Sequence, residues 1–399
     1  MRTIAEIVPT GLRIRVLLFI TGALNTPLSV ILAQTPVRSA ALDTLAIEHV
    51  TVLPMDRDTA LGDHTVLVAR DRIVWVGPAG AARVPAAARR VDGRGRYLIP
   101  ALADMHVHLD NGVKELPLYV AAGVTTVRNM RGRPEHLAWR SRVAAGTLVG
   151  PTIYTSGPTV AGARFFDWDR GFVGPRSEDD AERIVLQQAR AGYDMVKVHS
   201  RLTLPIYRRL LATARRAQIP VVGHLISEVG LAHTLSAGQV SIEHAGVALV
   251  EGDVTRFDAR ARSMATAGIW VGTIVTAWEG RCGAPTAMQQ RVIALLRRAN
   301  VKLLAGTDAG LESIAPGTSL HCELATLVQA GLTPYEALVS ATRNAGEFAR
   351  LHLKERVPFG TITVGSRADL VLLPADPRRD IGALARPIGT MVRGVWHPR

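Results

Sequence analysis

The stretch GYDMVKVHSRLTLPIYRRLLATARRAQIPVVGH, residues 192–224, holds one copy of the pattern that decides the fold. An apolar run opens it, and a second apolar run closes it at 220–223. Between them Ile206, Leu210 and Ala214 recur at helical spacing on one face. This spacing predicts an amphipathic helix, and the apolar runs on either side of it predict buried strands. The stretch therefore predicts two parallel strands joined by a helix.

The same alternation extends through residues 100–350. The strand candidates are eight apolar runs, at 102–107, 124–128, 152–156, 194–198, 220–223, 240–243, 270–275 and 302–307. Eight strand–helix units in this length predict an α/β fold, a closed (β/α)8 TIM barrel. We expect the last helix to begin at Thr333, where Pro334 and Glu336 complete a capping box.

Short β-like segments flank the barrel at both ends of the chain. Three of them lie before residue 79, a loop is expected at 79–90, and two more blocks fall within 360–397. We expect them to form one small sheet domain from residues 43–100 and 357–399, with the barrel at 101–356.

Composition excludes several classes of protein. Of the 399 residues, 48% are hydrophobic and 20% charged, which is sufficient for a large core and argues against disorder. The net charge is +13, but only four of the 47 basic residues are lysines and no basic stripe with interleaved aromatic residues accompanies them. We therefore expect no nucleic-acid partner. Two cysteines cannot form a disulfide framework or a Cys-rich zinc site.

The N-terminal segment is typical of an export signal. An uncharged apolar run at 16–33 follows Arg13 and Arg15, and Asn25 and Pro27 interrupt it, which disfavours a stable membrane span. We expect residues 1–33 to be a signal peptide and the mature protein to be periplasmic or secreted. The alternative is a buried N-terminal segment.

Two histidines end the first strand candidate. His106 and His108 are two residues apart, so on a strand both imidazoles face the same side and can converge on one cation. The alternative is a pair of hydrogen-bonded or exposed histidines.

A lysine lies inside the fourth strand candidate. Burial of an ammonium is costly, so Lys197 requires a partner or neutralisation. A neutral amine can react with carbon dioxide to form a carbamate, an anionic ligand able to bridge two metals. The alternative is an ordinary ion pair with a nearby carboxylate.

Three more metal-ligating residue types follow strand candidates: His224, His244 and Asp308. Each alone is typical of a core or capping residue, and Asp308 especially could cap a helix. In a barrel, however, all strand ends of one kind surround a single mouth. Together with the first three residues, they predict a site for two divalent ions, with zinc preferred and manganese or cobalt feasible.

With these residues in place, the chain resembles the amidohydrolase superfamily, in its imidazolonepropionase-like and Xaa-Pro-dipeptidase-like branch. The resemblance rests on YLIPALADMHVH, GVTTVRNM, GYDMVKVHS, LLAGTDAG and GTITVGSRADLVLL. It implies a barrel with a small β-sandwich built from both termini. It also implies His106, His108 and Asp308 on one metal, His224 and His244 on the other, and a carboxylated Lys197, N6-carboxylysine, bridging them.

The resemblance further implies metal-assisted hydrolysis, with Asp308 taking the proton of the attacking water and passing it to the leaving nitrogen. The candidates for substrate binding are residues expected around the mouth: Tyr154, Arg164, His199, Arg201, Trp278 and His321. His199 shares a strand face with Lys197, and either arginine could bind a substrate carboxylate. His321 and Glu323 could also orient a ligand.

The function we expect is hydrolysis of an amide C–N bond by an exported, dipeptidase-like binuclear metal enzyme. Its small-molecule substrate would be a dipeptide or an N-acyl amino acid. The alternatives are a cyclic-amide or lactone hydrolase, and a metal-binding homologue without catalysis. The sequence is compatible with a homo-oligomer and does not set the oligomeric state.

Overall fold

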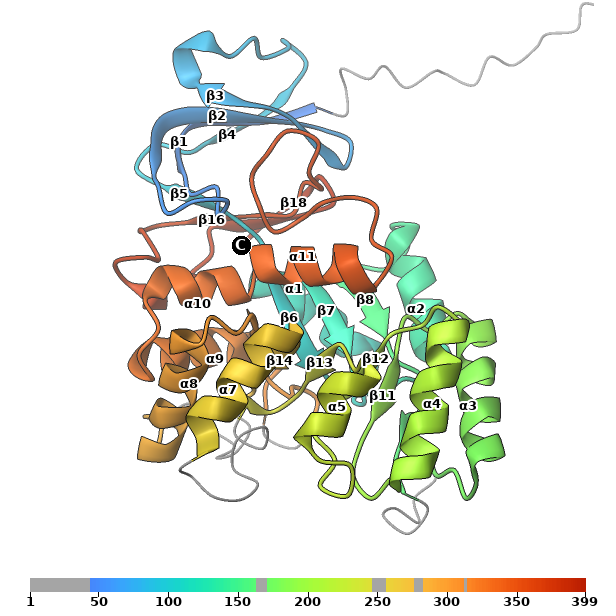
Figure 1. Ribbon diagram of the computed structural model, residues 1–399. Coiled ribbons are helices and arrows are strands. Elements are labelled where there is room, and N and C mark those ends of the chain that lie inside the picture. The colour runs from blue at the N-terminus through green and yellow to red at the C-terminus, as the bar shows by residue number, and fades with distance from the viewer. Residues whose placement is uncertain (1–43, 163–170, 246–255, 276–282, 312–313) are drawn as a thin grey trace, which may run out of the picture. The chain divides into compact units, whose positions relative to one another are not determined.

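The computed structural model describes residues 44–162, 171–245, 256–275, 283–311 and 314–399. The leader predicted at 1–33 lies outside these residues. Parallel strands form the centre of the described part (Figure 1). They are β6 (Leu102–Val107), β7 (Val124–Asn129), β8 (Thr152–Thr155), β11 (Val196–Val198), β12 (Val221–Gly223), β13 (Ser241–Ile242), β14 (Trp270–Gly272) and β15 (Leu303–Leu304).

Backbone contacts close these strands into a ring. A parallel bridge between Ser156 and Met195 joins the end of β8 to β11. On the other side, the Met105 amide donates to the Ala305 carbonyl at 2.8 Å, which joins β6 to the chain after β15. Each predicted strand candidate overlaps one of these strands, although β7 ends one residue beyond its predicted bound, and the TIM-barrel-type α/β fold is confirmed. Short strands β9 (Thr159–Val160) and β10 (Phe172–Val173) extend the ring beside β11.

Helices follow every barrel strand in chain order. They are α1 (Leu116–Ala121), α2 (Pro134–Ala144), α3 (Glu178–Ala191), α4 (Leu204–Arg216), α5 (Leu231–Ala237), α7 (Phe257–Ala267), α8 (Ala287–Arg298), α9 (Thr318–Gln329), α10 (Pro334–Ser340) and α11 (Arg343–His352). The helix predicted between the strand candidates at 194–198 and 220–223 is α4, which buries Leu210 and Ala214. In the described part, no helix is both long and apolar enough to cross a membrane.

The helix that begins after Thr333 is α10, and its predicted capping box is present. The prediction that it is the last helix is wrong, because α11 follows it. The chain leaves the helical conformation between them: the Ala341 carbonyl accepts from the Ala103 amide at 2.7 Å, and the Ser340 carbonyl accepts from the Ala305 amide at 3.1 Å. The carbonyl groups of this junction therefore accept hydrogen bonds from the backbone of the barrel ring. In a continuous helix, the same carbonyl groups would instead accept from amides within the helix.

Helix α11 fills one end of the barrel. Its buried residues Ala345, Phe348 and Ala349 pack with Met105 and Trp270 of the strand interior. Figure 1 shows α11 between the barrel strands and the strands built from the chain's two ends. The N-terminal ends of the barrel strands are therefore packed with apolar side chains.

The terminal segments form one sheet in the order β18-β17-β16-β5-β1-β2-β3, with β4 paired to β1. Its strands are β1 (Thr44–Val52), β2 (Leu61–Ala69), β3 (Arg72–Pro78), β4 (Arg89–Asp92), β5 (Tyr97–Pro100), β16 (Leu370–Leu373), β17 (Gly389–Val392) and β18 (Val395–Pro398). The two ends of the chain meet where β5 pairs with β16. The expected loop at 79–90 begins with a short 3-10 helix, Ala79–Ala81, and it is wrong at its end, where β4 begins. The β-sandwich interpretation stays a prediction.

We predict that Gly346→Ala lowers the free energy of unfolding, although alanine is favoured over glycine in a helix by about 1 kcal/mol. A Cβ at Gly346 of α11 would lie 2.0 Å from the Phe359 carbonyl oxygen, a backbone atom that cannot move aside cheaply. We expect a loss of roughly 1–3 kcal/mol in urea denaturation. Gly62→Ala is the control, since a Cβ there meets nothing within 4 Å. Equal or greater stability of Gly346→Ala would contradict the close packing of α11.

Candidate metal centre

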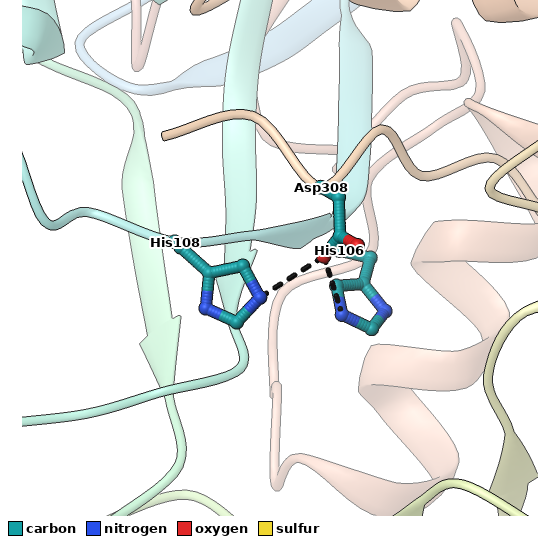
Figure 2. A group of neighbouring side chains, drawn as sticks. All are labelled: His106, His108 and Asp308. Atoms are coloured by element: carbon teal, nitrogen blue, oxygen red, sulfur yellow. Dashed lines mark hydrogen bonds and ion pairs between the residues drawn. The ribbon is translucent and has the colours of Figure 1, made fainter. Parts of the chain in front are cut away.

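Two histidines and one aspartate converge at the C-terminal ends of β6 and β15. Asp308 Oδ1 lies 3.1 Å from His106 Nε2 and 3.0 Å from His108 Nε2. Figure 2 shows both imidazoles directed at this carboxylate. One ligand atom from each of the three buried residues lies within 4.8 Å of the others. Strand alternation places both histidines on the same side, as the sequence predicts.

The next two histidines continue around the barrel mouth. His244 Nε2 lies 3.8 Å from Asp308 Oδ2, and the His244 ring lies 5.0 Å from the His106 ring and 4.8 Å from the His224 ring, measured between centroids. His244 and Asp308 have left-handed backbone, with φ of 62° and 63°. Non-glycine residues rarely adopt this conformation, and it is commonest at functional sites.

Lys197 extends from the middle of β11 into the same region. Its side chain is 1% exposed, and its Nζ has no hydrogen-bond partner among the described residues. Burial lowers the pKa of its ammonium to about 8. A buried amine without a partner is costly unless something neutralises or coordinates it. Among the described residues, no carboxylate is close enough to Lys197 Nζ to form the ordinary ion pair that was the alternative to a carbamate.

The charge states of these residues suit metal ligands. Burial and the nearby histidine and lysine charges lower the pKa of His244 to about 3, and burial with the charge of Lys197 holds the pKa of His224 well below its usual value. Burial alone would raise the pKa of Asp308, but the adjacent His106 and His108 hold it well below its usual range. Neutral imidazoles and an ionised carboxylate are the forms that bind divalent metals.

Sequence reasoning missed a buried ion pair beneath these histidines. Arg128 of β7 donates from Nη2 to both carboxylate oxygens of Glu243 at 2.8 Å, and both side chains are 0% exposed. The same carboxylate accepts from Ser241 Oγ at 2.5 Å and faces His106 Nδ1 at 3.0 Å. The sequence did carry a signal, because Glu243 lies at the end of a predicted buried strand. A glutamate is rarely buried without a partner, so its position indicates a buried cation nearby.

One of the residues expected to bind substrate lies beside these histidines. The His199 ring stacks 3.8 Å from the His224 ring, and its Nδ1 accepts from the Ser200 amide. Burial lowers the pKa of His199 to about 3. Arg201 is exposed. Arg164 and Trp278 lie outside the described residues.

Two other expected substrate contacts point elsewhere. The Tyr154 hydroxyl donates to Glu355 after α11, so it faces the packed end of the barrel rather than the mouth. His321 Nε2 donates to the Ala122 carbonyl, next to the start of β7. The structure therefore does not bring these two side chains together with the histidines, and their role in substrate binding stays a prediction. Strand alternation and position in the sequence cannot tell which end of a barrel a long side chain reaches.

Glu323 also lies close to a strand end. Its carboxylate accepts from Thr273 Oγ1 at 2.6 Å and from the Val275 amide at 3.0 Å, directly after β14. These contacts anchor the loop that leaves β14, and Thr273 in turn bonds to the chain at Leu304 and Ala245 through its backbone. Glu323 thus supports the mouth indirectly.

An arginine that was not predicted lies at the rim. Arg131 follows β7, and its guanidinium lies 5.4 Å from the Phe172 ring centroid. Phe172 lies 6.2 Å from His199 in an edge-to-face arrangement. Arg131 and Arg133 both donate to Asp110, so the three side chains carry a net positive charge. The charge of Arg131 also contributes to lowering the pKa of His108 and Lys197.

The relatives found by sequence comparison include two that this chain covers to different extents. An imidazolonepropionase from Micrococcus luteus is 28% identical over 425 residues, which cover 90% of this chain and 98% of that protein. An adenine deaminase from Deinococcus radiodurans is 28% identical over 340 residues, which cover 81% of this chain. The chain spans only 57% of the length of that deaminase.

Solved structures with the same fold include prolidases. A putative prolidase from Bifidobacterium longum matches with a TM-score of 0.76 and 24% identity, covering 90% of this chain and 95% of that one. A prolidase complexed with N-methylphosphonate-L-proline matches with a TM-score of 0.74 and 20% identity, covering 89% of this chain and 100% of that one. At these identities the likeness concerns the fold. A model of the amidohydrolase family matches residues 97–397, and the chain therefore belongs to that family.

Proposed function

We propose that this protein is a binuclear metal-dependent hydrolase that cleaves the amide C–N bond of dipeptides or N-acyl amino acids. The observation that carries the proposal is the convergence of buried imidazoles, one ionised carboxylate and one unpartnered buried lysine at the barrel mouth. Membership of the amidohydrolase family supports hydrolysis at a C–N bond.

The residues fit two divalent ions, for which we propose zinc. His106, His108 and Asp308 would hold one ion, His224 and His244 the other, and a carboxylated Lys197 would bridge them. The donor set of imidazole nitrogen and carboxylate oxygen suits zinc. The Lys197 amine has no hydrogen-bond partner among the described residues, and a carbamate bound to metal would give it one. Ions bound there would lower the pKa of a water molecule and polarise the scissile carbonyl.

Asp308 is the residue to which we assign the proton transfer. Its carboxylate is ionised well below neutrality and sits between three imidazoles, so it can accept a proton from the attacking water. Donating that proton to the leaving nitrogen would complete the hydrolysis without any external acid. His106 and His108 hold Asp308 in this position.

A substrate carboxylate is the group that the rim selects. Arg131 supplies a guanidinium near His199, and Arg131 and Arg133 together carry positive charge in excess of their shared partner Asp110. Dipeptides and N-acyl amino acids carry a carboxylate two bonds from the scissile nitrogen, which such a cation would bind. The prolidase fold neighbours are consistent with this substrate class.

The alternative is a cyclic-amide or lactone hydrolase. It is supported by the imidazolonepropionase relative, which this chain covers over 98% of its length. A non-catalytic metal-binding homologue is a remote alternative, because Asp308 is present where the proton must be moved. We also propose that residues 1–33 direct export to the periplasm or outside the cell, and that the terminal sheet belongs to a small β-sandwich domain.

A substrate screen tests the proposal. Zinc-loaded and manganese-loaded protein should release amino acids from dipeptides or N-acyl amino acids, and should leave cyclic amides and lactones intact. Asp308→Asn keeps the shape and one ligating oxygen but cannot accept the proton, so turnover should fall by roughly 100-fold or more while metal content changes much less. Ring opening without dipeptide cleavage would favour the alternative.

We predict that Lys197→Ala loses most of its bound metal and activity. Because the missing group is a small carboxylate, a short carboxylic acid at high concentration should restore part of the activity. Lys302→Ala is the matched control and should be nearly silent, since Lys302 pairs with Glu347 on the surface. Metal analysis and turnover measure both variants. Two bound metals and full activity in Lys197→Ala would replace the bridged site with one built on His106, His108 and Asp308.

We predict that Arg131→Gln selectively impairs substrates with a free carboxylate. The kcat/KM of a cleaved dipeptide should fall roughly tenfold or more, and that of its C-terminal amide should change little, because a charge-assisted hydrogen bond is lost only with the acid. Arg133→Gln is the control, since it shares Asp110 but makes no ring contact to Phe172. Equal losses on acid and amide would exclude carboxylate recognition by Arg131.

A further inference from the structure

The ion pair of Arg128 and Glu243 lies directly behind His106 and is not itself placed to bind metal. Arg128 comes from β7 and Glu243 from the residue after β13, so the pair joins two strands across the barrel interior. Arg128 is held from three sides: its Nε donates to the Met105 carbonyl at 2.6 Å, its Nη1 donates to Ser241 Oγ at 3.2 Å, and its guanidinium lies 4.9 Å from the Phe348 ring centroid. Such a guanidinium has little freedom to move.

The carboxylate of Glu243 is held equally firmly. Both oxygens accept from Arg128, and Oε1 also accepts from Ser241 Oγ. Gly272 of β14 leaves the space that Oε2 needs, because a Cβ on Gly272 would lie 2.3 Å from that oxygen. Glu243 Oε2 therefore has a fixed position, 3.0 Å from His106 Nδ1.

This geometry has a consequence for the His106 ring. A carboxylate beside Nδ1 accepts the Nδ1 proton, so in the neutral ring the lone pair lies on Nε2. Nε2 is the nitrogen that faces Asp308 and the other candidate ligands. A histidine whose second nitrogen donates to a fixed carboxylate is also oriented in rotation and is a more basic ligand.

We propose that Arg128 and Glu243 are a positioning pair that fixes the tautomer and orientation of His106 for metal binding. Glu243 acts on His106 directly, and Arg128 acts through Glu243. The inference rests on the metal site of the proposed function. It assigns a role to two residues outside the proposed set of metal ligands.

Removing Glu243 alone is an incomplete test, because it leaves the Arg128 cation buried without a partner, which commonly costs about 3–5 kcal/mol. Two further variants avoid that problem. The double variant Arg128→Met with Glu243→Gln removes both charges. Gly272→Ala keeps both charges and displaces the carboxylate from His106 by contact with Oε2.

The matched control is a second buried ion pair that does not approach the histidines. Arg367 Nε lies 2.6 Å from Asp369 Oδ2, and the two side chains are 4% and 3% exposed. Arg367 also donates from Nη2 to Thr126 Oγ1 of β7. The control variant is Arg367→Met with Asp369→Asn. It should lower stability without changing the metal site.

The experiment measures zinc affinity by competition with a chelator, the melting temperature of the metal-free protein, and the visible spectrum of the cobalt-loaded protein. We expect Gly272→Ala and the Arg128–Glu243 double variant to lose roughly 10- to 100-fold in zinc affinity and to alter the cobalt spectrum. The control should keep the wild-type affinity and spectrum at a lower melting temperature. Wild-type zinc affinity in folded Gly272→Ala and in the folded double variant would overturn the positioning role. Failure of the wild-type protein to bind zinc or cobalt would instead refute the proposed function.

Discussion

Burial of charge at one end of the barrel is the constraint on which the rest of the site depends. An isolated buried ion costs several kcal/mol even after the protein relaxes around it, so each charge needs its own compensation. Arg128 and Glu243 compensate each other, and Asp308 lies in contact with ring nitrogens of His106 and His108. The Lys197 amine, by contrast, has no hydrogen-bonding partner among the described residues. The chemistry that we propose for Lys197 follows from this imbalance.

The two ends of the barrel differ in character: one end is packed with apolar side chains, and the other carries the candidate site. At the N-terminal ends of the strands, Phe348 and Ala345 of α11 pack on Met105 and Trp270, and the interior there is apolar. At the C-terminal ends, the interior positions carry histidine, lysine and carboxylate side chains. Apolar packing at the N-terminal end offsets the free-energy cost of burying polar groups at the C-terminal end. This division is usual in TIM barrels.

The sequence predicts the parts of this site that depend on local pattern. Strand alternation is sufficient to place His106 and His108 on one side, and an apolar run is sufficient to place Lys197 inside the barrel. It does not predict that Arg128 meets Glu243, because the partners are separated by 115 residues and pair only through the closed ring. It does not predict the contacts of Tyr154 and His321 for a related reason: a long side chain can reach either end of a strand, and the contacts that decide between them come from distant segments.

Backbone conformation explains why Glu243 was overlooked while its neighbour His244 was found. On a regular strand, adjacent side chains face opposite sides, so alternation would send Glu243 and His244 in different directions. The left-handed conformation of His244, with φ of 62°, ends the alternation, and both side chains then contact the His106 neighbourhood. Such a conformation costs of order 1–3 kcal/mol and persists only where its surroundings enforce it. Here the surroundings are Gly272, which leaves space for Glu243, and Gly306, where a Cβ would lie 2.6 Å from that of His106. The arrangement of the polar mouth therefore depends on the space left by Gly272 and Gly306 as well as on the polar side chains themselves.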